Sequence, residues 1–567
     1  MINLEIRKKI ENLFEEKKYE ELIKLSNEYI KPNERPPGLA SLIGTCYFLK
    51  KKRTLEDLSF ALKFFEEAYF KGQKNIHGLS GVTNFINLSV IGAKKSIDFL
   101  PYIEKAEKYY NEVENYFGTN SDFLIAAKNL FWFQLNNKKV KKITDKIISH
   151  PNSSFVQKSG SIFFQNYIYN WSQQKYTEQV IINSKNFSKY KVKKLNEINY
   201  NENNKINIGF VCADFTDQHS LFYFLKDTIK YLDRKKFKVF LFSFNRGVNA
   251  ELGQKEIKSV GDEFIELDKL NNQDCINLIQ EKKISILIDL MGFSFTKRVE
   301  IFNSRIAPIQ ISWLATCNTV GFETIDYLIA DKNLIPQAED DQYPEKILKL
   351  PNIWNSHCGY DFERVLKKSP FLSRDFFTFG SLNNFHKISD EVISVWSEIL
   401  KRCEKSKLIL KSSSFEANGN KIIEMFKKNN VEKQIILLSN RNYPYKKNHL
   451  EVYNDIDLAL DTFPYNGVTT TFEALWMSVP VLVLKGFNFN SRCGYSIIKN
   501  SNNENLISYN QDDYIEKAVY YYNNRRELSE LKTDLFNKIL LTPLFQTKNF
   551  SKNFEKSLLN LNKNNLN

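Results

Sequence analysis

The residues best suited to chemistry lie between two short apolar runs in the C-terminal half of the chain. Residues 461–476 read Asp-Thr-Phe-Pro-Tyr-Asn-Gly-Val-Thr-Thr-Thr-Phe-Glu-Ala-Leu-Trp. The apolar runs 456–460 and 480–484 flank this stretch and predict two buried strands. Between them, a turn rich in Pro, Asn and Gly followed by three threonines predicts a helix start. The unpaired N–H groups and positive dipole end of such a helix hold an anion such as a diphosphate.

A ligand-free explanation of the same stretch stays open. Thr470 and Glu473 are three residues apart, which is the spacing of an ordinary capping box. A crossover helix that is capped in this way needs no anion. The gap between a strand end and the next helix is, however, where ligands bind in open α/β sheets. The residues alone therefore support a phosphate site and a plain helix cap about equally.

Three more predicted loops carry side chains suited to work on a phosphate. His219 follows the apolar run 206–211, and histidine titrates near neutrality, which suits proton transfer or phosphate contact. Lys387 lies in Gly380–Ser389, where an amine could neutralise the charge on a leaving diphosphate. His449 lies in a loop between two predicted strands. The plain alternatives are a solvated histidine, a surface lysine and a histidine that caps a helix.

The elements that position these residues fall into a helical part and an α/β part. Apolar residues recur at helical spacing in four segments of the first 200 or so residues: Leu13–Ile30, Leu58–Tyr69, Tyr102–Phe117 and Val140–Ile148. Their irregular recurrence predicts degenerate helical hairpins stacked as a short tetratricopeptide-like solenoid, whose surface suits peptide binding. Helices that merely cover a catalytic domain are the alternative.

Short β-branched and aromatic runs separated by helical patterns then form two series, as in parallel α/β sheets. The first series is Ile206–Val211, Phe237–Phe242, Ile284–Leu290, Pro308–Leu314 and Tyr327–Ala330. The second is Phe376–Gly380, Lys407–Leu410, Gln434–Leu438, Ile456–Leu460 and Val481–Leu484. The predicted fold class is α/β, with two Rossmann-like lobes after an all-α region. The predicted domains are 1–195 (helical repeats), 205–365 (first lobe), 366–510 (second lobe) and 511–567 (C-terminal helices packing back on the lobes).

Composition narrows the class of protein. The chain has 567 residues, 42% of them apolar, which allows two to four domains. The net charge of +14 is spread along the chain, so we expect no nucleic-acid partner. The seven cysteines are far apart and include no Cys-x-x-Cys pair, which indicates neither a disulfide scaffold nor a zinc site. No apolar run approaches the roughly 18 residues that span a bilayer, so we expect a cytoplasmic protein without a membrane span.

The stretch 461–476 resembles the nucleotide-sugar motif of the protein O-GlcNAc transferase and SPINDLY family, including its bacterial members. The resemblance implies that one set of residues cradles the donor diphosphate: Asn466, Gly467, Thr469 and Thr470. It also implies that Glu473 holds the ribose. Val468 stands where the animal enzyme has a histidine, and Glu473 where that enzyme has an aspartate; the plant SPINDLY proteins share the glutamate.

The same resemblance extends over about residues 205–560, through five motifs in the family's order. It implies that His219 and Lys387 are catalytic, with Lys387 on the diphosphate. His449, twelve residues before Asp461, matches a histidine that stacks on the nucleobase, and Lys446 matches a lysine near the base edge. Residues 315–319 depart from the family's Gly-Tyr-Pro-Gly-Thr loop, which bears on the acceptor side.

A metal mechanism is the less attractive reading of the motifs. Asp455-Ile456-Asp457 has the Asp-x-Asp form of metal-dependent glycosyltransferases, but such short patterns arise often by chance. The family that the chain resembles works without metal, so Lys387 and the helix start at Thr469–Thr471 would take the place of the cation. We therefore expect no metal and no cofactor.

The resemblance implies a GT-B fold and an inverting glycosyltransferase that moves a sugar from a nucleotide-sugar donor to Ser or Thr of a protein. UDP-GlcNAc is the first choice of donor, and GDP-fucose is the alternative because of Glu473 and Val468. The helical repeats would bind part of the protein acceptor. A third hypothesis is a helical-repeat binding protein with an inactive transferase-like domain. The altered loop 315–318 argues for it, and the retained motif residues argue against it: Lys387, His219, His449 and Glu473.

Overall fold

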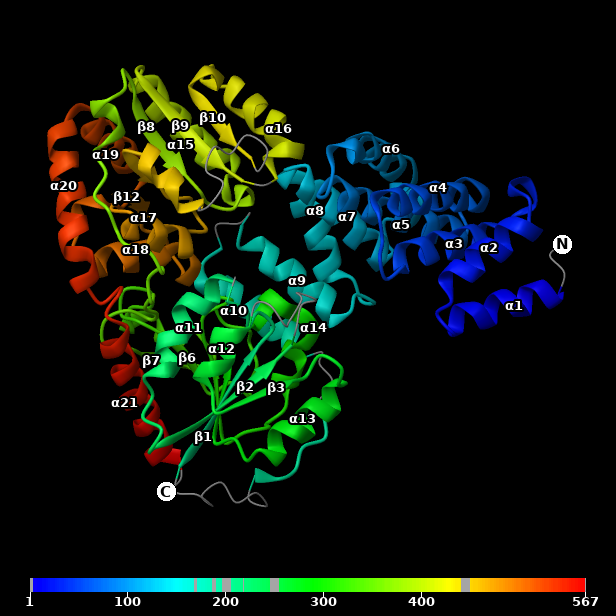
Figure 1. Ribbon diagram of the computed structural model, residues 1–567, viewed down its shortest axis with the longest axis horizontal. Helices are drawn as coiled ribbons and strands as arrows, with labels where there is room; N and C mark the ends of the chain where they lie inside the picture. The colour runs from blue at the N-terminus through cyan, green and yellow to red at the C-terminus, as the bar shows by residue number, and fades with distance from the viewer. Residues whose placement is uncertain are drawn as a thin grey trace. The chain divides into compact units, whose positions relative to one another are not determined.

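The structure is a computed structural model that describes residues 4–167, 171–185, 190–195, 205–217, 219–244, 254–412, 414–439 and 449–565. It divides into two compact units (Figure 1). The first unit comprises Met1–Gln157 with Ser413–Ile422, and the second comprises Lys158–Ser412 with Ile423–Asn567. In the described residues, no helix is long and apolar enough to cross a membrane.

The first unit is helical along the N-terminal part of the chain, which confirms the prediction of an all-α region. Its successive helices are α1 (Leu4–Glu15), α2 (Tyr19–Tyr29), α3 (Pro37–Leu49), α4 (Leu55–Gly72), α5 (Ile76–Ala93), α6 (Leu100–Phe117), α7 (Ser121–Phe133) and α8 (Asn137–Ser149). Neighbours in sequence pack on one another, and α4 and α5 approach closely because Gly81 has no side chain. A Cβ there would lie 2.5 Å from the Tyr69 nitrogen and 2.8 Å from the Phe65 carbonyl oxygen.

The second unit contains a first lobe built on a parallel seven-stranded sheet of order β3-β2-β1-β4-β5-β6-β7. Its strands are β1 (Ile206–Cys212), β2 (Phe237–Ser243), β3 (Glu263–Glu266), β4 (Ile286–Asp289), β5 (Ile309–Ser312), β6 (Tyr327–Ala330) and β7 (Lys346–Lys349). The longer helices between them are α11 (Ser220–Lys230) and α13 (Asn272–Glu281). The central strands are apolar runs because helices bury both faces of a parallel sheet.

The second lobe is built on a parallel six-stranded sheet of order β10-β9-β8-β11-β12-β13. Its strands are β8 (Phe377–Ser381), β9 (Ser406–Lys411), β10 (Ile435–Leu438), β11 (Leu458–Leu460), β12 (Val481–Leu484) and β13 (Ile507–Ser508). Its helices are α15 (Asp390–Arg402), α16 (Phe415–Lys427), α17 (Thr469–Trp476) and α18 (Phe489–Asn500). Two parallel-sheet lobes after a helical region confirm the predicted fold class.

Each sheet reverses its strand order once, between β1 and β4 in the first lobe and between β8 and β11 in the second. Ligands of open α/β sheets bind outside the carboxyl ends of the strands at such a switch point. The chain leaves β1 toward His219, β8 toward Lys387, and β11 toward the 461–468 loop. The topology therefore brings three of the predicted site segments to the two switch points.

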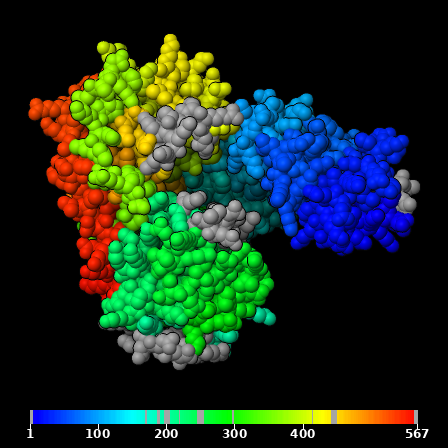
Figure 2. Space-filling model, in the orientation of Figure 1, coloured from blue at the N-terminus to red at the C-terminus, as the bar shows by residue number. Residues whose placement is uncertain are grey.

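The C-terminal helices α19 (Gln511–Asn523), α20 (Arg525–Lys538) and α21 (Thr547–Asn565) contact both lobes. Figures 1 and 2 show this part of the chain, in red, running along the two lobes. Tyr514 on α19 donates to the Asp461 carbonyl oxygen over 3.0 Å. Ser551 on α21 donates to the Thr228 carbonyl oxygen of α11 over 2.8 Å.

Polar side chains also join the two lobes directly. Arg492 on α18 makes a two-pronged ion pair with Glu339 of the first lobe, over 2.7 and 2.9 Å. Ser496, one turn further along α18, donates to the buried Asp331 carboxylate over 2.7 Å. Burial raises the pKa of Asp331 to about 6, although the hydrogen bonds that its carboxylate accepts from Ser496 and from backbone N–H groups act in the opposite direction. The α18 helix is thus the element of the second lobe that holds the end of β6 and the residues after it.

The residues just before β1 belong to the second unit. The α9 helix (Phe155–Gln165) leads into it, and α10 (Gln173–Ser184) packs on the first lobe. Gln173 donates to the side-chain oxygen of Asn318 over 2.8 Å. Gly321, with a positive φ of 75°, lets α10 approach, because a Cβ there would lie 2.8 Å from the Val180 carbonyl carbon. The α10 helix therefore belongs to the same compact unit as the two lobes.

Candidate active site

A pocket of about 350 Å³ lies between the two lobes within the second unit. First-lobe residues on its wall include Asp214, His219, Ser220, Leu221, Phe224, Ser294, Leu314, Ala315, Cys317, Trp354 and Asn355. Second-lobe residues on its wall include Asn383, Asn384, Lys387, Tyr465, Val468, Thr469 and Thr470. The fold therefore brings four predicted site residues, which are far apart in sequence, to one cavity: His219, Lys387, Thr469 and Thr470.

The loop after β11 is shaped by the buried carboxylate of Asp461. Its Oδ1 accepts hydrogen bonds from the backbone N–H of Thr462 and of Gly467, over 2.9 and 2.7 Å. It also accepts the side-chain amide of Asn383 over 3.1 Å. The Asn383 oxygen in turn accepts the Thr470 hydroxyl over 3.1 Å. Asp461 and Asn383 thus tie the end of β8, the turn and the start of α17 into one network.

Gly467 and Asn466 complete this turn without standing on the pocket wall. A Cβ at Gly467 would lie 2.9 Å from Asp461 Oδ1 and 2.4 Å from the Thr470 hydroxyl oxygen, so any larger residue would displace side chains of this network. Asn466 is fully buried, donates to the Thr462 carbonyl oxygen over 2.8 Å, and accepts the Gly494 N–H over 3.2 Å. These two predicted diphosphate residues therefore support the turn from beneath, whereas Thr469 and Thr470 line the pocket.

Lys387 reaches the same turn from the other side of the switch point. Its Nζ donates to the Asn466 carbonyl oxygen over 2.7 Å and lies 4.3 Å from the centre of the Tyr465 ring. Burial lowers the pKa of Lys387 to about 8, while the nearby Asp461 carboxylate opposes that shift. Below that pKa the side chain is a cation on the pocket wall next to the start of α17.

The α17 helix begins in the way that an anion site requires. Its N-cap residue is Val468, and no side chain caps it. The capping box of Thr470 and Glu473, which the sequence left open, does not form, because Thr470 lies inside the helix and its hydroxyl donates to Asn383. The first N–H groups of an uncapped helix are free to bind an anion. Thr469 and Thr470 bring this end of the helix to the pocket.

His219 stands at the opposite lobe's switch point and caps α11. Its Nδ1 accepts the backbone N–H of Leu221 over 3.3 Å, so the remaining ring nitrogen, Nε2, carries the proton in the neutral form. Both His219 and Asp214 line the pocket. The histidine therefore lies in the cleft and is held there by its hydrogen bond to the start of α11.

The 315–319 loop closes the first-lobe side of the pocket with unusual backbone geometry. Leu314 and Cys317 have positive φ angles of 72° and 48°, which non-glycine residues rarely adopt. The Thr316 hydroxyl holds the loop by accepting the Phe293 N–H over 2.7 Å and donating to the Met291 carbonyl oxygen over 3.2 Å. Ala315 and Cys317 thereby face the pocket.

Glu473 and His449 form a cluster of their own, beyond that pocket wall. The Glu473 carboxylate accepts hydrogen bonds from the Tyr453 and Tyr360 hydroxyls, over 3.1 and 3.3 Å. His449 Nε2 lies 3.0 Å from the same carboxylate, and the histidine side chain is half exposed. The predicted ribose and base residues therefore lie together. Lys446, the third member of that prediction, lies outside the described residues.

The Asp455–Asp457 pair is occupied by structural contacts. Asp455 forms an ion pair with Arg374. Asp457 accepts the backbone N–H of Thr378 over 2.8 Å and that of Phe371 over 3.2 Å. In the described part of the chain, no group of three or more His, Cys, Asp or Glu side chains has the arrangement of a metal site.

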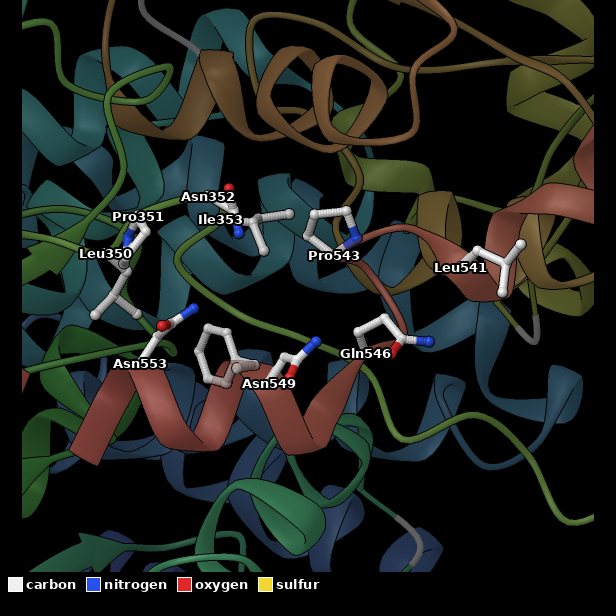
Figure 3. A pocket seen from close by; sticks show the side chains of 10 residues that line it. Leu350, Pro351, Asn352, Ile353, Leu541, Pro543, Gln546, Asn549 and Asn553 are labelled. Carbon is white, nitrogen blue, oxygen red and sulfur yellow. The ribbon is translucent and has the colours of Figure 1, made fainter. Parts of the chain in front are cut away.

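A second pocket, shown in Figure 3, differs in chemistry from the first. It holds about 110 Å³ between the residues after β7 and the helix α21, where Asn549 and Asn553 point into it. Its walls contain amides, prolines and apolar side chains but no ionisable group. Since a diphosphate needs cationic or N–H partners, the larger interlobe pocket is the candidate active site.

The sequence did not single out several residues of that pocket. Trp354 and Asn355 follow β7, and within the described residues the buried Trp354 indole nitrogen and Asn355 side-chain oxygen have no hydrogen-bond partner. Nothing in their local sequence signals this position. Asn383 lies in the same motif as Lys387, and Tyr465 in the same motif as Asn466 and Gly467. Neither residue has a local sequence pattern that predicts its contacts, because those contacts are made with residues far along the chain.

The comparisons agree with this arrangement. Among curated proteins, the tomato "Probable UDP-N-acetylglucosamine--peptide N-acetylglucosaminyltransferase SPINDLY" is 29% identical over 358 residues, covering 61% of this chain and 38% of the relative. The corresponding protein named SEC of Arabidopsis thaliana is 30% identical over 368 residues, covering 62% and 36%. The chain thus matches little more than a third of these relatives' length.

Among solved structures, a mutant of the Thermobaculum terrenum O-GlcNAc transferase superposes with a TM-score of 0.76 at 20% identity. The match covers 90% of this chain and 95% of that one, so the two share the whole fold. The family model described as "Glycosyl transferase family 41" matches residues 172–368 and 364–554, which include both lobes and the pocket between them. The chain belongs to glycosyl transferase family 41.

Proposed function

We propose that this protein transfers a sugar from a nucleotide-sugar donor to a serine or threonine hydroxyl of a protein, with inversion at the anomeric carbon. The observation that carries the proposal is the meeting of Lys387 with the uncapped start of α17 on one pocket wall. A cation and a helix N-terminus at a switch point are what a departing nucleoside diphosphate requires.

In the proposed reaction the acceptor hydroxyl oxygen bonds to the anomeric carbon as the bond from that carbon to the diphosphate oxygen breaks. The electron pair of the broken bond goes to the diphosphate. Lys387 and the first N–H groups of α17, at Thr469 and Thr470, stabilise the charge that develops there. The hydroxyl proton passes to a solvent water, because the Nδ1 of His219 accepts the Leu221 N–H and its Nε2 already carries a proton in the neutral form. His219 is assigned a role close to the acceptor or the sugar.

For the donor we propose UDP-GlcNAc, since the curated relatives carry UDP-N-acetylglucosamine in their names. GDP-fucose is the alternative, because Glu473 and Val468 are the two departures from the animal motif. The Glu473–His449 cluster is proposed to hold the ribose and base, with Lys446 near the base edge. The stacking of a base on a ring such as His449 is worth roughly 1–3 kcal/mol.

For the acceptor we propose an unfolded protein segment that lies partly on the first unit, since stacked helical hairpins offer an extended surface. We also propose that the reaction needs no metal ion. Lys387 supplies the positive charge next to the diphosphate, and both carboxylates of the Asp455–Asp457 pair are already engaged.

The test is a panel of nucleotides and nucleotide sugars applied to the full chain with EDTA present. Calorimetry with UDP and GDP identifies the nucleotide, and release of nucleotide from UDP-GlcNAc or GDP-fucose measures turnover. The proposal expects one nucleotide to bind and its sugar donor to turn over. Nucleotide binding without turnover of any donor would favour the inactive binding protein. Turnover that returns only after addition of Mn²⁺ or Mg²⁺ would overturn metal independence.

A further inference from the structure

Described residues of the segment between α9 and α10, together with the first residue of α10, bond to both lobes beside the candidate active site. The carbonyl oxygen of Trp171 accepts the side-chain amide of Asn488, which begins α18 of the second lobe, over 3.2 Å. Gln173 bonds Asn318 of the first lobe. Trp171 and Gln173 therefore contact both lobes next to the pocket, although they precede β1 in the chain.

Tyr167, at the start of that segment, packs on a residue of the donor-side loop. Its ring is stacked on the ring of Tyr465, with centroids 4.6 Å apart and planes 9° from parallel. Phe163 of α9 touches the edge of Tyr167, with centroids 6.0 Å apart. A stack of this geometry holds both rings in one orientation and is worth roughly 0.5–1.5 kcal/mol beyond the area that it buries.

Tyr465 contacts Tyr167 with its ring and also contacts Lys387. The Lys387 ammonium lies 4.3 Å from the centre of the Tyr465 ring, within the range of a cation–π interaction. Tyr465 also lines the pocket, so its ring forms the wall along which the lysine side chain extends. Any rotation of the Tyr465 ring would move this wall and admit water to the ammonium.

The other groups that face Lys387 come from three elements. Asp461 lies in the loop after β11, Cys493 on α18, and Cys317 in the 315–319 loop; each favours the charged form of the lysine. Burial acts in the opposite direction and is the larger effect. The state of Lys387 therefore depends mainly on how completely its surroundings exclude water.

We infer that Tyr167 is a positioning residue for Lys387, acting through the ring of Tyr465. Tyr167 thereby supports the donor-site wall from a part of the chain that precedes the first lobe. The catalytic role of Lys387 in this inference rests on the proposed function. The contacts among Tyr167, Tyr465 and Lys387, and the exclusion of water by them, do not depend on it.

The test measures the protonation of Lys387 without using any donor. Full-length protein is trace-labelled with acetic anhydride across a range of pH, and acetylation at Lys387 is followed by peptide mass spectrometry. The wild-type midpoint is expected near the pKa of about 8. Tyr167→Ala admits water, so its midpoint should move upward by about one unit, while Tyr167→Phe keeps the ring and the wild-type midpoint.

Val180→Ala serves as the matched control, because Val180 is a buried α10 residue that packs on Gly321 and not on the stack. It should lower the unfolding temperature without moving the Lys387 midpoint. If Tyr167→Ala is insoluble, Tyr167→Leu replaces it. Leucine keeps apolar bulk but loses the ring stack, so the Lys387 midpoint should move upward by less than in Tyr167→Ala. A folded Tyr167 variant without the ring that keeps the wild-type midpoint would overturn the inference.

Transfer kinetics separate this inference from the proposed function. Where a donor is turned over, Tyr167→Ala should lower kcat about tenfold with a smaller change in KM, and Tyr167→Phe should restore it. If the Lys387 acetylation midpoint moves upward in Tyr167→Ala but neither wild type nor any variant turns over a donor, the positioning role is supported. The same result contradicts the proposed function. Turnover unchanged in Tyr167→Ala, with an unmoved midpoint, would contradict the positioning role alone.

Discussion

At the scale of single residues, the account depends on Lys387. The sequence indicated this lysine through its motif, but neither its partner nor its burial could be read there. Both arise from contacts with residues 78 and 79 positions away, at Tyr465 and Asn466. Such long-range pairs leave no periodic trace in the sequence. The same holds for Asp461, whose bond to Asn383 also spans 78 positions.

Lys387→Ala is expected to abolish transfer while the fold and the nucleotide site persist. Removing a group that stabilises developing charge typically costs about 3 kcal/mol, or roughly 10²–10³ in kcat. Steady-state kinetics and thermal unfolding measure the two effects. Lys407→Ala, a lysine on β9 that donates to a backbone carbonyl oxygen, is the control and should leave turnover unchanged. Near-wild-type turnover in Lys387→Ala would remove the lysine from the mechanism.

The pH dependence of kcat/KM, which reports groups of the ligand-free protein, should report the same side chain. Burial lowers the pKa of Lys387 to about 8, and the lysine is a cation below that value. Stabilisation of the leaving diphosphate is therefore complete below the pKa and is lost as pH rises through about 8. The pH–rate profile should fall on its alkaline side near there. A profile that stays flat to pH values near the ordinary lysine pKa of about 10.4 would contradict this assignment.

His449→Ala is expected to weaken nucleotide binding more than it slows the reaction. Stacking on a base is felt equally in the ground state and the transition state, so KM should rise and kcat should change little. The lost contact corresponds to roughly 1–3 kcal/mol, or about 5- to 150-fold in affinity. Calorimetry with UDP and GDP is the measurement. Equal affinity of the variant and wild type for both nucleotides would exclude His449 from the site.

At the scale of elements, the strands at the centres of both sheets were predicted because they are apolar runs buried on both faces. The edge strands β3 (Glu263–Glu266) and β7 (Lys346–Lys349) were not, since each begins and ends in a charged residue and is only partly buried. The sequence left open whether Thr470 and Glu473 form a capping box at the start of α17. The box is absent because the N-cap is Val468 and Thr470 lies inside the helix, and tertiary contacts with two tyrosines and His449 engage Glu473 instead.

Gly467→Ala tests the turn that joins β11 to α17. The added Cβ would lie within 3 Å of the Thr470, Asn383 and Asp461 oxygens, so the turn must shift away from its network. We expect nucleotide affinity to fall at least about tenfold, which corresponds to about 1.4 kcal/mol. Gly160→Ala in α9, where a Cβ meets nothing within 4 Å, is the matched control and should bind as wild type does. Equal affinities for the two variants would show that the turn does not shape the site.

At the scale of the whole molecule, the division into two units bears on how the helical region can be removed. Cutting at residue 195, the predicted end of that region, would delete Tyr167, Gln173 and α10, all of which contact the lobes. The polar stretch before β1 suggested this boundary from the sequence. The buried contacts of α10 could not be foreseen there, because its partners lie about 140 residues further along the chain.

Removal of residues 1–150 should therefore spare nucleotide binding and lower transfer to a protein acceptor. The fragment keeps α9, α10, both lobes and the C-terminal helices. Calorimetry with the preferred nucleotide and glycosylation of a protein substrate are compared for the fragment and the full chain. A fragment cut at 195 is the contrast and should bind nucleotide less well. Protein glycosylation by the 151–567 fragment at the full-length rate would exclude the helices as the acceptor platform.

The central claim is tested most directly by intact and peptide mass spectrometry of an acceptor protein mixture. The mixture is incubated with the full chain and either UDP-GlcNAc or GDP-fucose, with Lys387→Ala in parallel. The account predicts a mass increase of one sugar on Ser or Thr residues with one of the two donors, accompanied by nucleotide release, and its loss in Lys387→Ala. Equal modification by wild type and Lys387→Ala, or modification with neither donor and no nucleotide release, would contradict it.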